Sequence, residues 1–172
     1  MNMLNIILSI FLAIVILGSA YLIKLDASKK GSVSYPFFLS TRDDVTNIRS
    51  GPSLDYPIVH IYKKKGMPLK ILDKNKDWYY SEDFIGNEGW VYKNLLSSRK
   101  TAVITAKSST IYKTASSFSK ALLILERNNI INIISCKPTG VFCKVNFQSS
   151  ILELEITGWI STSDMWGNTL IE

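Results

Sequence analysis

The sequence is poor in the side chains that most enzymes use for chemistry. It has a single histidine, His60, and only two cysteines, Cys136 and Cys143. Three such ligands fall short of the four that a structural zinc site needs, and the residues around the cysteines match no nucleophile motif that would pair with a histidine base. No glycine-rich phosphate loop is present. The sequence therefore predicts neither an enzyme, nor a metal site, nor a cofactor.

A dense basic face is also missing. The chain has 20 basic and 14 acidic residues, a formal charge of +6. Three lysines and one aspartate fall in residues 1–34, eleven basic and eight acidic residues in 35–100, and six and five in 101–172. A nucleic-acid-binding surface normally gathers its basic residues on one face. Because the excess is mild and spread out, we expect no nucleic-acid partner.

Charge is absent altogether from residues 4–23, a run of 20 residues. A helix of that length can cross the hydrocarbon core of a bilayer. We expect residues 1–25 to form either a retained membrane anchor or a signal peptide that is cut after Ala20, where small residues precede the cleavage site. Residues 26–34 are small and polar and predict a linker.

The sequence gives conflicting signals about the side of the membrane on which the chain after residue 23 lies. Lys24, Lys29 and Lys30 follow the apolar run, and the positive-inside rule would place them in the cytoplasm. The cysteine pair favours an oxidising compartment instead. We expect a cell-envelope protein that is periplasmic, secreted, or anchored in the inner membrane by residues 4–23.

From residue 35 onward the pattern changes to short strands separated by turns. Residues 58–62 are rich in strand-forming side chains, and in residues 67–71 apolar side chains alternate with others. Turn signals follow at 63–66 and 74–77. One helical turn is expected at residues 94–96. This spacing is typical of a small all-β barrel or sandwich.

The chain also repeats itself weakly. Residues 158–160, Gly-Trp-Ile, take the place of Gly-Trp-Val at 89–91, and the strand at 141–145 takes the place of the one that begins at Trp78. A repeat of this kind means two units of one fold. We place the first unit at residues 35–98 and the second at 101–170.

These motifs resemble the bacterial SH3-like domains, in a tandem form found in exported proteobacterial proteins of uncharacterised function. The first unit matches on residues 47–52, 77–78 and 88–91, and the second on residues 158–160 and 164–167. The residues that define the motif are Arg49, Gly51, Pro52, Gly89, Trp90, Gly158 and Trp159. The resemblance implies an all-β chain of two tandem SH3-like barrels after an N-terminal hydrophobic helix. It implies no catalysis; related single domains commonly bind peptidoglycan peptides or target an attached enzyme to the wall.

The two cysteines flank a turn at residues 137–140. In a hairpin centred there, Cys136 and Cys143 would face each other across neighbouring strands, close enough for a disulfide. We expect a disulfide if the domain is exported. The alternative is a pair of reduced, buried cysteines that pack as small apolar side chains.

Aromatic residues of the first unit suggest a binding surface, because aromatic grooves hold extended peptides. We expect Tyr56 and Trp78, with Tyr62 or Tyr80, to line a shallow groove. Lys63 and Lys64 would attract an anionic ligand to its rim, or form only a solvated turn. Trp90 and Trp159 are expected to seal the two cores.

The predicted function is therefore that of a non-enzymatic binding module of the cell envelope. Its ligands would be peptide-like, plausibly peptidoglycan stem peptides. Two alternatives remain: a structural protein that docks on another envelope protein, and a targeting subunit of a cell-wall hydrolase. An uncleaved N-terminal segment would add the membrane as a partner.

Overall fold

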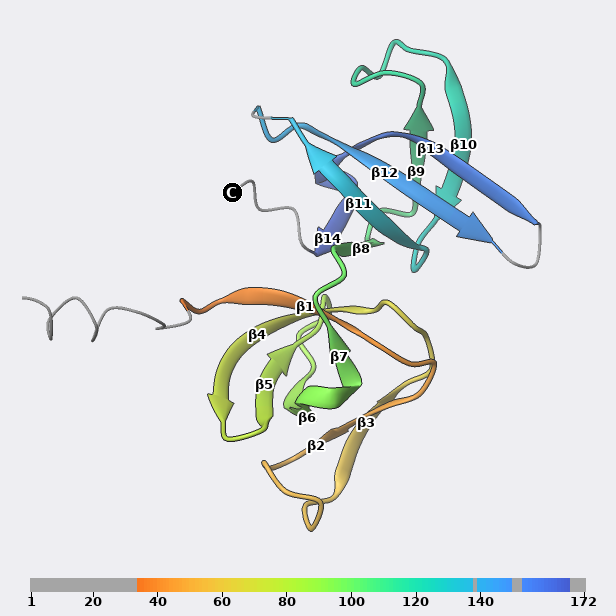
Figure 1. Cartoon of the computed structure of the whole chain (residues 1–172). Coiled ribbons are helices and arrows are strands. Elements are labelled where there is room, and N and C mark those ends of the chain that lie inside the picture. The colour runs from red at the N-terminus through yellow and green to blue at the C-terminus, as the bar shows by residue number, and fades with distance from the viewer. Residues whose placement is uncertain (1–33, 138, 150–152, 168–172) are drawn as a thin grey trace, which may run out of the picture. The chain divides into compact units, whose positions relative to one another are not determined.

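The computed structural model describes residues 34–137, 139–149 and 153–167, and all of its regular structure apart from two 3-10 turns is β-strand. The strands form two seven-stranded antiparallel sheets, each strongly bent, one after the other along the chain (Figure 1). The hydrophobic helix expected at residues 1–25 lies outside the described residues. Within the described ranges, no helix is long and apolar enough to span a membrane.

The first sheet contains seven strands in the order β3-β2-β6-β5-β4-β1-β7. A 3-10 turn, η1, spans Lys93–Leu95 where a single helical turn was expected. The strands are β1 (Phe37–Thr41), β2 (Thr46–Arg49), β3 (Ile58–Tyr62), β4 (Pro68–Asn75), β5 (Trp78–Glu82), β6 (Glu88–Tyr92) and β7 (Leu96–Ser97).

The second sheet has the order β10-β9-β13-β12-β11-β8-β14, which repeats the first strand for strand. Its 3-10 turn, η2 (Thr162–Asp164), precedes the last strand just as η1 precedes β7. The all-β tandem prediction is thereby confirmed. The strands are β8 (Thr101–Ile104), β9 (Ser108–Tyr112), β10 (Ala121–Glu126), β11 (Ile130–Cys136), β12 (Phe142–Ser149), β13 (Leu154–Ser161) and β14 (Met165–Gly167).

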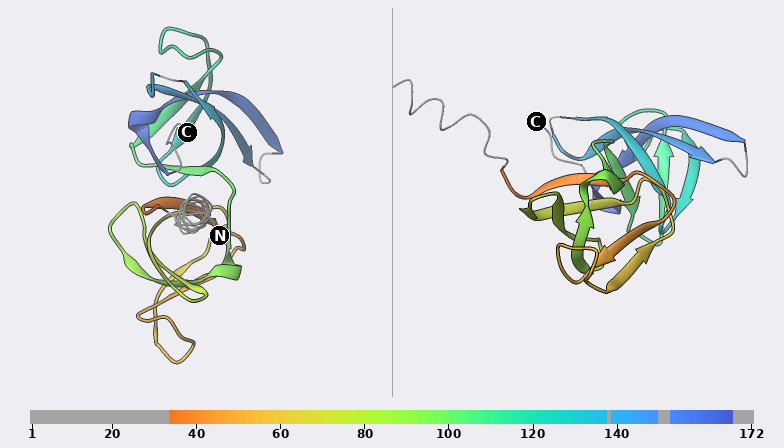
Figure 2. Two further views of the ribbon diagram at one scale, coloured as in Figure 1. Left: turned by 60° about the vertical axis from the view of Figure 1, so that its left-hand side comes forward. Right: turned by 60° about the horizontal axis from the view of Figure 1, so that its bottom comes forward.

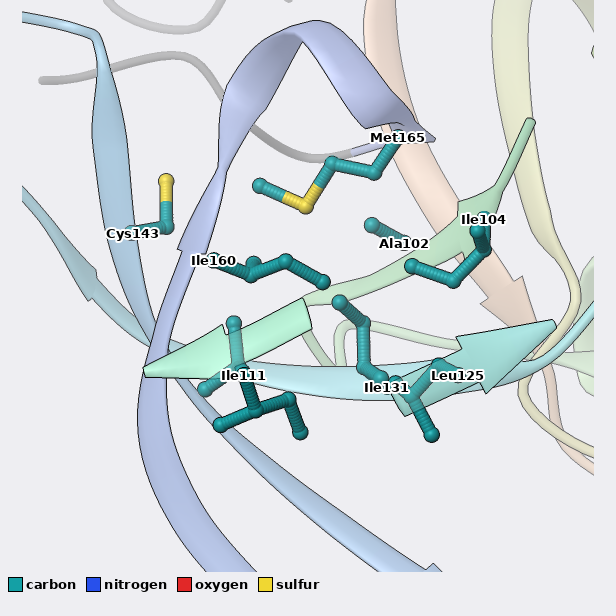
Figure 3. Close-up of a cluster of buried hydrophobic side chains, with 9 residues drawn as sticks. Ala102, Ile104, Ile111, Leu125, Ile131, Cys143, Ile160 and Met165 are labelled. Atoms are coloured by element: carbon teal, nitrogen blue, oxygen red, sulfur yellow. The ribbon is translucent and has the colours of Figure 1, made fainter. Parts of the chain in front are cut away.

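Each sheet encloses a mostly aliphatic core of its own. The second core is drawn in Figure 3, where isoleucines from β8, β9, β11 and β13 converge. Trp90 and Trp159, which we expected to seal the cores, belong to neither. Successive side chains of a strand point to opposite faces of the sheet. Gly89 and Val91 are buried against the core, so Trp90 between them lies on the outer face. The buried residues of the first core are Ile48, Leu69, Ile71, Val91 and Leu96.

A glycine lets two strands approach closely at the same place in each sheet. A Cβ atom on Gly89 would lie 2.5 Å from Cγ2 of Ile48 and 2.9 Å from the carbonyl oxygen of Arg49. On Gly158, the distances to Cγ2 of Ile111 and the carbonyl oxygen of Tyr112 would be 2.5 Å and 2.6 Å. Neither site has room for a side chain, so the glycines of the repeat are required by packing.

A buried carboxylate organises the β5–β6 hairpin. Asp83 accepts hydrogen bonds from the Tyr62 hydroxyl (2.8 Å), the backbone N–H groups of Ile85 and Asn87 (3.0 and 2.9 Å) and the Asn87 side chain (2.9 Å). Burial raises the pKa of Asp83, but these donors outweigh it and hold the pKa below the usual 3.8. Burial and the bond to Asp83 raise the pKa of Tyr62, so its hydroxyl stays a donor.

The two cysteines are joined by a disulfide between β11 and β12. Cys136 lies directly opposite Cys143 in the register of this hairpin. Cys143 is fully buried in the second core. Among the described residues there is therefore no free thiol.

Buried hydroxyls connect the two sheets. Ser40 Oγ, on β1, lies 2.8 Å from Thr101 Oγ1, on β8, and the Thr101 hydroxyl donates to the carbonyl of Gly66 at 2.8 Å. Both side chains are buried. Because these polar groups satisfy one another, they can be buried without the cost of an unpaired donor or acceptor.

The close approach at the glycines gives a stability test. We expect Gly89→Ala and Gly158→Ala each to lower the free energy of unfolding by about 1–3 kcal/mol, since the new methyl group has to displace backbone. Urea denaturation of the chain measures this. Gly86→Asn is the matched control: no atom lies within 4 Å of a new Cβ, and its φ of +85° is strained for a side chain but least so for Asn, so the change should stay below about 1 kcal/mol. Equal effects at all three positions would contradict the packing explanation.

The Asp83 network predicts an acid-dependent loss of stability. Because folding lowers the pKa of this carboxyl, its stabilising effect is present above its unfolded value near 3.8 and is lost as pH falls through the lower folded value. Asp83→Asn should therefore flatten the decline in the free energy of unfolding between about pH 5 and pH 2. Tyr62→Phe, which removes one of the donors, should flatten it partly. An unchanged acid decline in Asp83→Asn would rule out this role.

Candidate functional site

The outer face of the first sheet carries two pairs of aromatic side chains. Trp78 on β5 lies opposite Tyr92 on β6, with ring centroids 5.4 Å apart, and Tyr80 lies opposite Trp90 at 5.2 Å. All four are half-buried. They share this face because the strand register sets their neighbours Tyr79 and Val91 against the core. The result is an aromatic surface that is held by sheet geometry.

The loop after β2, residues 50–57, projects from one end of this sheet (Figure 2). Nη1 of Arg49 donates to the carbonyl oxygens of Leu54 (3.0 Å) and Tyr56 (2.6 Å) and so holds the loop in shape. The Tyr56 ring packs against Gly51, where a Cβ atom would lie 2.5 Å from the ring. The Arg-Ser-Gly-Pro motif is thus the structural basis of the loop.

This loop and the aromatic face enclose a groove of about 880 Å³. Its walls are Asn47 and Arg49 from β2, residues 52–55 from the loop, and Trp78 and Tyr92 from the aromatic face; Lys76 and Leu95 complete them. A groove of this size, with apolar walls and a few polar groups, is typical of a binding site for a small molecule or a short peptide. We call it the Trp78 groove.

The charges in the Trp78 groove are two cations and one carboxylate. Arg49 and Lys76 supply the positive charge, and Asp55, which accepts a hydrogen bond from the Ser53 hydroxyl at 2.8 Å, the negative charge. Next to Lys76, the exposed Asp77 pairs with Lys93 at 2.8 Å. The Lys93 hydrogen bond and charge lower the pKa of Asp77. The groove therefore has a small net positive charge.

The structure does not bring all the sequence-predicted site residues into one groove. Trp78 lines it, and Tyr80 is on the same face but packs on Trp90 and donates to Glu88 at 2.7 Å. Tyr56 covers Gly51, and the Tyr62 hydroxyl faces Asp83.

The lysines of the expected rim lie elsewhere. Lys63 and Lys64 follow β3 and line no part of the Trp78 groove. The Lys64 ammonium donates to the carbonyl of Asn128, in the turn between β10 and β11, at 2.7 Å, and burial lowers the pKa of Lys64.

Sequence reasoning missed Tyr92, Asn47 and Lys76. Period-two alternation from Trp90 would have placed Tyr92 on the outer face, but its pairing with Trp78 depends on the strand register. Lys76 enters the groove through a tight turn in which its φ is +53°, which the sequence does not specify.

The corresponding face of the second sheet has lost most of this surface. By strand register, Phe142 takes the place of Trp78, Lys144 of Tyr80, Trp159 of Trp90 and Ser161 of Tyr92. The ammonium of Lys137 lies 5.0 Å from the Trp159 ring centroid. Two of the four aromatic positions are thus polar, and the remaining tryptophan is covered by a lysine.

No curated protein matches the chain. Among solved structures, the chain is similar to NlpC2 and NlpC1 from Trichomonas vaginalis, each with 14% identity and a TM-score of 0.33. The alignments cover 78% and 79% of this chain but 49% and 47% of those chains, so the chain spans about half their length. Residues 42–98, which include the Trp78 groove, match the family described as bacterial SH3 domain. By this match, β2 to β7 of the first sheet are similar to a bacterial SH3 domain.

Proposed function

We propose that this protein is a non-enzymatic binding module of the cell envelope, and that its first SH3 domain holds peptide-like ligands in the Trp78 groove. The main observation behind the proposal is the groove itself, which has a volume of about 880 Å³ and lies between the loop at residues 50–57 and the Trp78–Tyr92 pair. Bacterial SH3 domains bind peptides or cell-wall components. Peptidoglycan stem peptides are the ligand class that we assign to it.

The chemistry of the groove supports this ligand class. Tyrosine and tryptophan present large, rigid surfaces with little conformational entropy to lose on binding. Such surfaces favour extended peptides with small side chains, which can lie flat against the rings. Asn47 and Arg49 add side-chain donors to the groove.

The proposed location is the cell envelope. The Cys136–Cys143 disulfide supports it, since structural disulfides persist in oxidising compartments. The uncharged run at residues 4–23 supplies a means of export or anchoring in this proposal. Separation of cell fractions, followed by N-terminal sequencing of the native protein, tests both points.

A second candidate function is docking on another envelope protein through the sheet edges. β3 is an edge strand and exposes Ile58, Val59 and Ile61; β10, its equivalent in the second sheet, exposes Ile124 at 66%. Open edge strands with apolar side chains can pair with a strand of another chain. Crosslinking to a protein partner, rather than retention on cell wall, would favour this function.

The groove is tested by removing its largest aromatic side chain. We expect Trp78→Ala to weaken retention of the protein on purified peptidoglycan sacculi by about tenfold or more, because buried tryptophans commonly dominate binding energy. The measurement is a sedimentation assay over a range of sacculus concentrations. Phe142→Ala, at the equivalent position of the second sheet, is the matched control and should bind like the unmodified protein. Unchanged retention of a folded Trp78→Ala variant would exclude the groove.

A further inference from the structure

The Trp78 groove contains two cations without a carboxylate partner. Among the residues that the structure describes, the ion pairs are Lys70–Glu82 and Lys93–Asp77. Neither Arg49 nor Lys76 takes part in one, although both line the groove. Surface cations often lack a partner, but two of them in one aromatic-walled groove give it a preference for negative charge.

Arg49 is held in place while much of its hydrogen-bonding capacity stays unused. Only Nη1 is engaged, by the carbonyl oxygens of Leu54 and Tyr56. A guanidinium group has five N–H donors, so about three remain on Nη2 and Nε. A guanidinium fixed by its own loop loses little entropy when it binds, and its planar fork matches the two oxygens of a carboxylate.

Lys76 contributes a charge whose position is set by the backbone. It lies in the turn between β4 and β5 with a φ of +53°, next to Trp78 in the groove wall. Its side chain is exposed, and an ammonium acts as a point charge, so it adds attraction without strict geometry. Asp55 is the one opposing charge in the groove, and it weakens the attraction for an anion.

We propose that the Trp78 groove recognises the free carboxylate at the end of a peptide, with Arg49 and Lys76 as its partners and the aromatic rings beside the last side chains. This inference rests on the proposed peptide-binding function and specifies which part of the peptide the groove recognises. An internal segment of a chain, or a peptide whose end is amidated, lacks the recognised group.

The test compares two probes that differ in one functional group. Diacetyl-Lys-D-Ala-D-Ala has a single carboxylate, at its end, and the C-terminal amide of the same peptide has none. We expect the acid to bind at least about fivefold more tightly than the amide in a calorimetric titration of the full chain, since charge-assisted hydrogen bonds are the stronger kind. Equal affinities for the two probes would overturn the inference.

Two variants change the charge of the groove in opposite directions. Asp55→Asn should strengthen binding of the acid by about two- to fivefold, and Lys76→Asn should weaken it by a similar factor, with the amide unaffected in both. Asn tolerates the positive φ of position 76. A gain of affinity in Asp55→Asn cannot come from misfolding. Lys113→Asn, on the second sheet, is the control and should change neither affinity.

The outcomes separate this inference from the proposed function. If the protein is retained on sacculi but binds the acid and the amide equally, or binds neither, the proposed wall-binding function is supported and the proposed recognition of the terminal carboxylate is wrong. If the protein is not retained on sacculi and binds neither probe, both fail. Preference for the acid with the expected response of both charge variants supports both.

Discussion

The close approach of β6 to β2 at Gly89 is the constraint on which the first sheet depends. With no Cβ at this position, the strands come together and the sheet bends over its own core. The same contact fixes the phase of β6, because Gly89 and Val91 must face inward. Trp90 and Tyr92 are then forced outward, where they meet Tyr80 and Trp78. One packing requirement thus produces both the core and the aromatic face.

The second sheet shows that this packing constraint does not require an aromatic outer face. Gly158 makes the same contact as Gly89, and the strand order is identical. Yet the outer positions hold Lys144 and Ser161 in place of aromatic residues. Packing of this fold constrains the side chains that face the core. The side chains on the outer face can therefore change without loss of the fold. The first sheet is therefore the one that carries the proposed site.

One hairpin of each sheet is closed by polar or covalent bonds, and the chemistry differs between the two sheets. In the first sheet, the β5–β6 hairpin is closed by the buried Asp83 and its four donors. In the second, the β11–β12 hairpin is closed by the Cys136–Cys143 disulfide. The loop at Arg49 adds a third device, a guanidinium that binds backbone carbonyls. Local networks of this kind fix turns that a small aliphatic core leaves unconstrained.

The sequence by itself determined the all-β class, the tandem repeat and the place of the cysteine hairpin. Period-two alternation, turn residues and paired Gly-Trp motifs are local signals, and they survive in any sheet that buries one face. Only the tertiary structure decided which aromatic residues share a surface. Tyr56 and Tyr62 do not line the Trp78 groove, whereas Tyr92 and Lys76 reach it through strand register and a tight turn. Register and turn geometry arise from pairing between distant segments. The residues that line the groove could therefore not be predicted from the sequence alone.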